Sequence, residues 1–357
     1  MAAYTTIDNP ELYFQTKLYT GTEDELAITL DGSENMQPDF VWIKRRATSQ
    51  NHFIFDSVRS ATKYINSNTS DPEYTQAQGL KSFDTDGFTL GTWDGPNDDV
   101  TNVAWCWKAG TAFSNDASAT SVGNTDSSGS ASSTAGFSIS KYEGAGASLD
   151  IQVKHGLSVK PAVMFTKNIE EAGGNHWAVY HHKNTSAPET DYLKLSDSAT
   201  TTDEATIWAD TEPTSAVFTA GDHSGSNRSG DDFISYHWNE VQGYSKFGSY
   251  VGSGASDGPV IVTGMRPAFI LIKNTTTSSR DWMMYDSKRQ GYNGANNYLV
   301  ANTNGSDQTG IEIDILSNGF KVRSSATGLN ASGVTHVFMA FAEQPFVNSK
   351  GVPANAR

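Results

Sequence analysis

Two polar loops of this chain combine the residue types that bind sugars. The first spans residues 93–98 and the second spans residues 222–231. Acids and amides can hydrogen-bond to hydroxyl groups, and an aromatic ring can stack on the apolar face of a sugar. The candidate glycan-binding residues are therefore Trp93, Asp94, Asn97 and Asp98 in the first loop, and Asp222, His223, Arg228 and Asp231 in the second.

A structural interpretation of both loops stays open. Asp, Asn and Gly are common in long hairpin turns because they suit turn geometry, and Trp93 can instead pack against its own domain. Oxygen-rich loops can also hold Ca²⁺. Asp222, Asp231 and Asp232 supply carboxylates, but the EF-hand spacing is absent. We therefore expect no cofactor, with Ca²⁺ as the alternative.

Two further patterns suggest enzyme or metal chemistry, but both lack the context that this chemistry needs. Residues 254–258 fit the G-x-S-x-G pattern of a nucleophile elbow. The helix that must follow such a serine is missing, since a Gly-Pro pair and an apolar run come next. His176, His181 and His182 could ligate zinc, yet neighbouring residues of a strand point to opposite faces. We expect a protein that is not an enzyme and has no metal site.

The composition argues against several kinds of partner. Lys and Arg total 25 and Asp and Glu total 40, a formal net charge of −15. A nucleic-acid-binding protein needs a basic footprint instead. No apolar stretch approaches the ~20 residues of a membrane span, and the N-terminus shows no signal peptide. Cys106 is the single cysteine, so an intrachain disulfide framework is excluded. These features predict folding in a cytoplasm, without nucleic-acid binding or membrane insertion.

A repeated pattern defines the elements that must position the loops. Apolar runs headed by proline recur at residues 38–44, 161–167 and 267–273. A tyrosine close to a glycine precedes each run, and an aromatic segment such as Trp105–Trp107 closes each unit. Short strands separated by turn residues are typical of sandwiches and barrels. We predict an all-β fold of three tandem β-sandwich repeats, jelly-roll-like in outline.

The repeats divide the chain into five segments. Asn9, Pro10 and Glu11 predict a short N-terminal helix. Residues 111–135 are rich in Ser, Ala, Gly and Thr, which predicts a flexible or extended linker. The predicted segments are residues 1–110 for the N-terminal segment and first sandwich, 111–135 for the linker, 136–243 for the second sandwich, 244–346 for the third, and 347–357 for a C-terminal tail.

Nearly the whole chain resembles a repeat domain of predicted virion proteins from tailed bacteriophages, especially marine and cyanobacterial ones. The segments that carry the resemblance are residues 36–44, 55–59, 103–108, 342–346 and 353–357. The resemblance implies a phage structural protein, often described as a tail fibre, with lectin-like sandwiches similar in outline to concanavalin A. The second unit departs from the pattern, because His181 and His182 stand where the other units have Asp56 and Asp286.

The resemblance and the loops lead to one expected function and two alternatives. We expect a tail fibre or tail-tip adhesin that binds a host-surface glycan, is made in the host cytoplasm and reaches the virion, which is released by lysis. Its partners would be other virion proteins and copies of itself, most simply in a trimer. The alternatives are a capsid decoration or head-fibre protein that binds only virion proteins, and a glycan-degrading enzyme. The enzyme is the weakest, because no paired-carboxylate site is evident.

Overall fold

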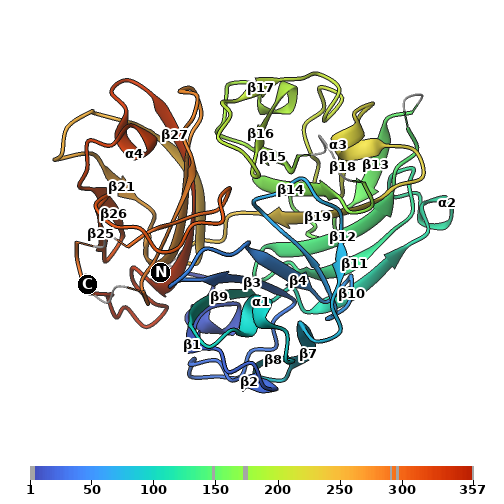
Figure 1. Ribbon diagram of the computed structural model, residues 1–357. Helices are drawn as coiled ribbons and strands as arrows, with labels where there is room; N and C mark the ends of the chain where they lie inside the picture. The colour runs from blue at the N-terminus through green and yellow to red at the C-terminus, as the bar shows by residue number, and fades with distance from the viewer. Residues whose placement is uncertain (1–4, 147–148, 172–175, 290–291, 295–296, 356–357) are drawn as a thin grey trace.

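The regular secondary structure of the chain is almost entirely antiparallel β-strand, so the predicted all-β class is confirmed (Figure 1). The computed structural model describes residues 5–146, 149–171, 176–289, 292–294 and 297–355. The predicted N-terminal helix is one 3₁₀ turn, and the side chain of Asn9 caps it by accepting a hydrogen bond from the Glu11 amide. The helical turns in the described residues are η1 Pro10–Leu12, α1 Asp94–Asn97, α2 Ala117–Thr120, η2 Pro188–Thr190, α3 Ser224–Asn227 and α4 Thr327–Asn330.

The strands form three sandwich units. Unit one contains β1 Phe14–Thr20, β2 Leu26–Ile28, β3 Phe40–Arg45, β4 Phe53–Asp56, β5 Lys63–Ile65, β6 Tyr74–Thr75, β7 Leu80–Asp84, β8 Gly87–Leu90 and β9 Thr101–Trp107. Unit two contains β10 Thr111–Asn115, β11 Ser127–Ser132, β12 Phe137–Glu143, β13 Ile151–Lys154, β14 Val163–Asn168, β15 Ala178–His181, β16 Asp191–Lys194, β17 Thr202–Asp203, β18 Val217–Ala220 and β19 Asp232–Trp238. Unit three contains β20 Ser245–Val251, β21 Val260–Val262, β22 Met265–Asn274, β23 Trp282–Asp286, β24 Leu299–Val300, β25 Ile313–Leu316, β26 Gly319–Val322 and β27 Thr335–Pro345.

The strand order of the large sheet corresponds in the three units. It runs β1-β9-β3-β4-β5-β6 in unit one, β12-β19-β14-β15-β16-β17 within the sheet of unit two, and β20-β27-β22-β23-β24 in unit three. A small sheet faces each large one, in the orders β2-β8-β7, β13-β18 and β21-β26-β25. The three proline-headed runs become β3, β14 and β22, so the prediction that they are strands is confirmed.

The predicted linker is wrong, because residues 111–115 and 127–132 form two strands of the sheet of unit two and the short helix α2 lies between them. Strand β10 pairs with β11, and β11 pairs with β12, each in continuous antiparallel register. Phe113 lies over Gly129, where a β-carbon would stand 2.7 Å from the ring of Phe113. Gly129, one of the small residues that suggested flexibility, therefore lets the aromatic ring approach the backbone of the neighbouring strand.

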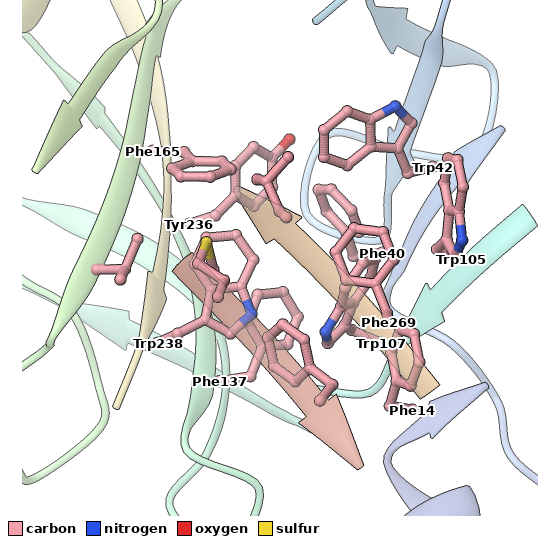
Figure 2. Packing of buried hydrophobic residues seen from close by; sticks show 14 of the residues in the cluster. Phe14, Phe40, Trp42, Trp105, Trp107, Phe137, Phe165, Tyr236, Trp238 and Phe269 are labelled. Atoms are coloured by element: carbon pink, nitrogen blue, oxygen red, sulfur yellow. The ribbon is translucent and has the colours of Figure 1, made fainter. Parts of the chain in front are cut away.

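The three large sheets share one hydrophobic core, shown in Figure 2. We call it the central core; it includes Phe14, Phe40 and Trp107 of unit one, Phe165, Tyr236 and Trp238 of unit two, and Phe269, Trp282 and Phe341 of unit three. Ring centroids meet across units, at 4.8 Å for Phe40 and Tyr236 and at 5.4 Å for Phe14 and Phe341. Every residue of β3 and β14 is buried, because one face packs on its own small sheet and the other on the central core.

Hydrogen bonds from one corresponding position link the units in a ring. In each unit the residue just before or at the start of β4, β15 or β23 donates a hydrogen bond from its side-chain ring to a backbone carbonyl of another unit. The bonds join His52 Nε2 to Val300 O at 3.0 Å, Trp177 Nε1 to Asn66 O at 2.9 Å, and Trp282 Nε1 to Lys194 O at 2.8 Å. His52 Nδ1 accepts from the indole of Trp42, so Nε2 carries the proton.

A second closed set of contacts between the units starts from the last residue of β4, β15 and β23. Asp56 of unit one accepts from the Tyr236 hydroxyl of unit two at 2.7 Å, and Asp286 of unit three accepts from the Trp105 indole of unit one at 3.1 Å. His181 of unit two has its Nε2 3.1 Å from the Phe338 carbonyl of unit three. Both sets of contacts run through all three units, so the chain closes on itself with approximate threefold symmetry. His181 thus replaces the aspartate in its position and in its contact with the next unit.

Candidate functional site

The first predicted loop is a single helical turn, α1, between β8 and β9. Asn97 is fully buried inside it and donates to Asp24 O at 2.6 Å and to Gly91 O at 2.7 Å. Asp98 pairs with Arg45 at 2.7 Å, whereas the side chain of Asp94 is exposed. Asn97 is therefore a structural residue, and its interpretation as a ligand for a glycan is wrong.

The second predicted loop is the corresponding turn of unit two, α3. His223 Nδ1 accepts from the Gly225 amide at 2.9 Å, and burial lowers the pKa of His223. Arg228 pairs with Glu171 and lies 3.7 Å from Asp231, while Asp222 is exposed. The two loops occupy equivalent places in different units, and no contact joins them among the described residues. They are two copies of one feature rather than two halves of one site.

The turns share a Gly-x-Asn pattern that the sequence analysis missed. The pattern stands at residues 95–97, 225–227 and 328–330. In each unit the tyrosine that precedes the apolar run donates to the middle residue's carbonyl, from Tyr19 to Pro96 at 2.6 Å, from Tyr142 to Ser226 at 2.7 Å and from Tyr250 to Leu329 at 2.6 Å. Aligning the three units on their tyrosines would have revealed this pattern and its structural role.

The residue before each turn stands beside a tyrosine at a corresponding position of the sandwich, and in units one and two its ring packs on that tyrosine. We call this place the tyrosine site and define it by four corresponding positions. They are Phe53, Tyr64, Tyr74 and Trp93 in unit one, Ala178, Tyr192, Thr202 and His223 in unit two, and Met283, Tyr298, Gln308 and Ala326 in unit three. Strand pairing fixes the correspondence, because Tyr64 lies opposite Tyr74, Tyr192 opposite Thr202, and Tyr298 opposite Gln308.

The tyrosine site of unit one is a stack of aromatic rings that reaches the surface. The ring of Trp93 lies 4.9 Å from Phe53 and 5.0 Å from Tyr64. Tyr64 stacks on Tyr74 at 5.2 Å with an interplanar angle of 20°, and Tyr74 is 39% exposed. Burial raises the pKa of Tyr64 to about 12. Trp93 therefore packs on its own sandwich, and Tyr74, which the sequence analysis did not select, presents the open ring.

The remaining candidates do not assemble into catalytic or metal sites in the part of the chain that the structure describes. No cluster of three or more His, Cys, Asp or Glu residues there could hold a metal ion. Asp231 accepts from Asn168 at 2.7 Å and Asp232 pairs with Lys141, so both carboxylates have protein partners. Residues 254–258 form bends without a following helix, so they lack the geometry of a nucleophile elbow. None of the described helices has the length and apolar character to cross a membrane.

The fold defines an all-β protein of three β-sandwich units, each with a tyrosine site at a corresponding place. The chain belongs to the family described as Domain of unknown function (DUF7483), which it matches over residues 9–345. This match spans the three units from η1 to the end of β27. A search of curated proteins finds none that matches the chain.

Proposed function

We propose that this protein is a non-enzymatic structural protein of a phage virion, a tail fibre or tail-tip adhesin, which binds a host-surface glycan through the tyrosine site of unit one. The observation that supports it is the exposed ring of Tyr74, held flat against Tyr64. Gln76 and Gln78 stand two and four residues after Tyr74 in the chain and are half-exposed and exposed, so they supply amide groups to the same surface segment. An aromatic face with amide groups beside it suits a sugar, which has apolar faces and polar edges.

The expected result of removing this ring is a loss of host adsorption. Tyr74→Ala should reduce adsorption of the purified protein to host cells at least tenfold, while the thermal unfolding midpoint stays within a few degrees of the parent. The matched control is Thr202→Ala, which truncates the corresponding residue of unit two and should leave adsorption unchanged. Tyr74 serves better than Trp93 here, because Trp93→Ala removes packing on Phe53 and Tyr64 and would weaken the fold.

Unchanged adsorption by Tyr74→Ala, with unchanged stability, would favour the capsid decoration or head-fibre alternative. In that case the protein binds only other virion proteins. Locating the protein in purified virions, at the tail or on the head, separates the two. A glycan-degrading enzyme stays the weakest alternative, because it requires a pair of carboxyl groups flanking the sugar.

We also propose a homo-oligomer, with a trimer as the simplest form. An exposed apolar patch on unit three is the surface that supports self-association. Val260 and Val262 on the edge strand β21 are 54% and 64% exposed, and Phe346 lies in the same groove as Val262. Light scattering at micromolar concentration should give three times the 38.5 kDa chain mass. A stable 38.5 kDa species would contradict the proposal.

A further inference from the structure

The tyrosine site of unit three is open, because a small residue stands where the other units place a ring. The residue before the helical turn is Trp93 in unit one, His223 in unit two and Ala326 in unit three. We propose that the pocket left by Ala326 binds a single uncharged pyranose residue. The inference rests on the proposed function for its ligand class, but it concerns a different unit and a different set of contacts.

The glycines of the three turns show that the ring is absent from unit three. A β-carbon on Gly95 would stand 2.6 Å from the Trp93 ring, and one on Gly225 would stand 3.0 Å from His223 Nδ1. The corresponding Gly328 has only the sulfur of Met283 nearby, at 3.5 Å. In units one and two the capping ring therefore folds back over the turn, and in unit three that space is unoccupied by protein.

A pocket of about 310 Å³ lies beside Ala326 and Gly328 in unit three. This size is at the lower end of the range for small-molecule sites, roughly 300–1,000 Å³. Tyr298 and Met283 supply the apolar lining, and they correspond to Tyr64 and Phe53, on which Trp93 packs in unit one. The pocket therefore offers a sugar ring the same surface that Trp93 covers in unit one.

The rim of the pocket carries a cationic, an anionic and an amide side chain. Arg280, Asp281 and Gln308 all line it. The Nε atom of Arg280 is buried and has no hydrogen-bond partner among the described residues. Asp281 accepts from Asn302 at 2.7 Å, and Gln308 accepts from the Tyr298 hydroxyl at 2.9 Å, so both side chains are held in place.

These contacts favour a neutral polyhydroxylated ring over a charged ligand. One guanidinium and one carboxylate balance each other at the rim, and the chain as a whole carries a net charge of −15, which repels anions. Sugar hydroxyls act as both donors and acceptors, so they can pair with the Arg280 guanidinium as well as with the Asp281 carboxylate, which both line the pocket. The C–H face of a pyranose would lie on the Tyr298 ring.

The test of the inference is to fill the pocket by placing at position 326 the tryptophan that unit one has at the corresponding position, Trp93. The probes are methyl α-D-glucopyranoside, methyl α-D-mannopyranoside, methyl β-D-galactopyranoside and N-acetylglucosamine, each at millimolar concentration in saturation-transfer NMR. At least one should bind the full-length protein, and Ala326→Trp should weaken that binding at least tenfold. The matched control is Ala326→Ser, which keeps the pocket open and should bind like the parent. Should the Trp variant fold poorly, Ala326→His, the residue of unit two, takes its place.

Two results would overturn the inference: binding of none of the four probes to the parent protein, or equal binding by parent and the filled variants. The two proposals fail separately. If Tyr74→Ala abolishes adsorption while the filled variants bind sugar like the parent, the pocket is excluded and the adhesin stands. If the pocket binds sugar but Tyr74→Ala leaves adsorption unchanged, the pocket stands and adhesion through the tyrosine site of unit one is excluded.

Discussion

Replacing Asp56 with alanine will lower the free energy of unfolding by about 3 kcal/mol, because it removes the nearer carboxylate partner of the buried Arg59 guanidinium, which keeps Glu73 at 3.2 Å. Neither side chain of the pair is exposed: the Asp56 carboxylate and the Arg59 guanidinium meet at 2.5 Å with side-chain exposures of 0% and 1%. The same carboxylate accepts from the amides of Val58 and Arg59 and from the hydroxyl of Tyr236 in unit two. The substitution therefore damages a turn and a unit interface together.

Two control variants separate the ion pair from the other contacts. Tyr236→Phe keeps the Asp56–Arg59 pair, removes the hydroxyl that donates to Asp56 and accepts from Arg59, and should cost about 1 kcal/mol. Asp31→Ala removes the exposed partner of Lys17 and should cost at most about 1 kcal/mol. Urea denaturation of all three variants gives the comparison, and Asp56→Asn is the milder substitute if the alanine variant does not fold. A loss below about 1 kcal/mol for both Asp56 variants would show that the pair does not stabilise the fold.

Stability will fall steeply as the pH drops below about 6.5, the ordinary pKa of histidine. Burial lowers the pKa of all eight histidines of the chain. Burial lowers the pKa of His155 to about 4 and that of His181 to about 3. His52 and His237 are fully buried, and burial places their pKa well below the ordinary value.

The direction of this pH dependence follows from whether the folded or the unfolded state binds more protons. Below pH 6.5 the unfolded chain protonates these histidines while the folded chain keeps them neutral, so acid favours unfolding. The contribution is complete above pH 6.5 and is lost as the pH falls towards the folded-state pKa values of about 3 to 4. Each such histidine costs about 1.4 kcal/mol per pH unit in this window. Four of them approach the whole stability of a typical domain, about 5–15 kcal/mol, within a few pH units.

Three buried lysines extend the same trend above neutrality. Burial lowers the pKa of Lys44 to about 7 and the pKa values of Lys167 and Lys273 to about 8. These lysines stand at corresponding positions in β3, β14 and β22. The unfolded chain keeps their protons up to an ordinary pKa near 10.4, so stability should go on rising between pH 7 and about pH 10.

His237→Cys is the matched variant for the acid prediction. Cys106 occupies the corresponding position in β9, and neither ring nitrogen of His237 has a hydrogen-bond partner among the described residues. The variant should lower the pH dependence by about 1.4 kcal/mol per pH unit between pH 4 and 6. Guanidinium denaturation from pH 4 to 9 measures the slope. A parent protein equally stable at pH 4.5 and 7.5 would contradict the prediction.

Local sequence patterns were enough to predict the class of fold and its strands. The runs that became β3, β14 and β22 are apolar, β-branched or aromatic, and bounded by turn residues, and these features act over a few residues. The Asn9 cap of the first turn is equally local. The same reasoning failed for residues 111–135, because pairing with β12 overrides their weak strand propensity.

The tertiary structure alone decided how the three units meet and which site is open. The sequence could not show that Asp56 and His181 reach the next unit, since each contact joins residues more than 150 positions apart. It could not separate Trp93 from Tyr74 as the exposed ring, because exposure depends on what packs beside each one. The pocket at Ala326 is the clearest case: a missing side chain becomes a cavity only when neighbouring strands place Tyr298 and Met283 around it.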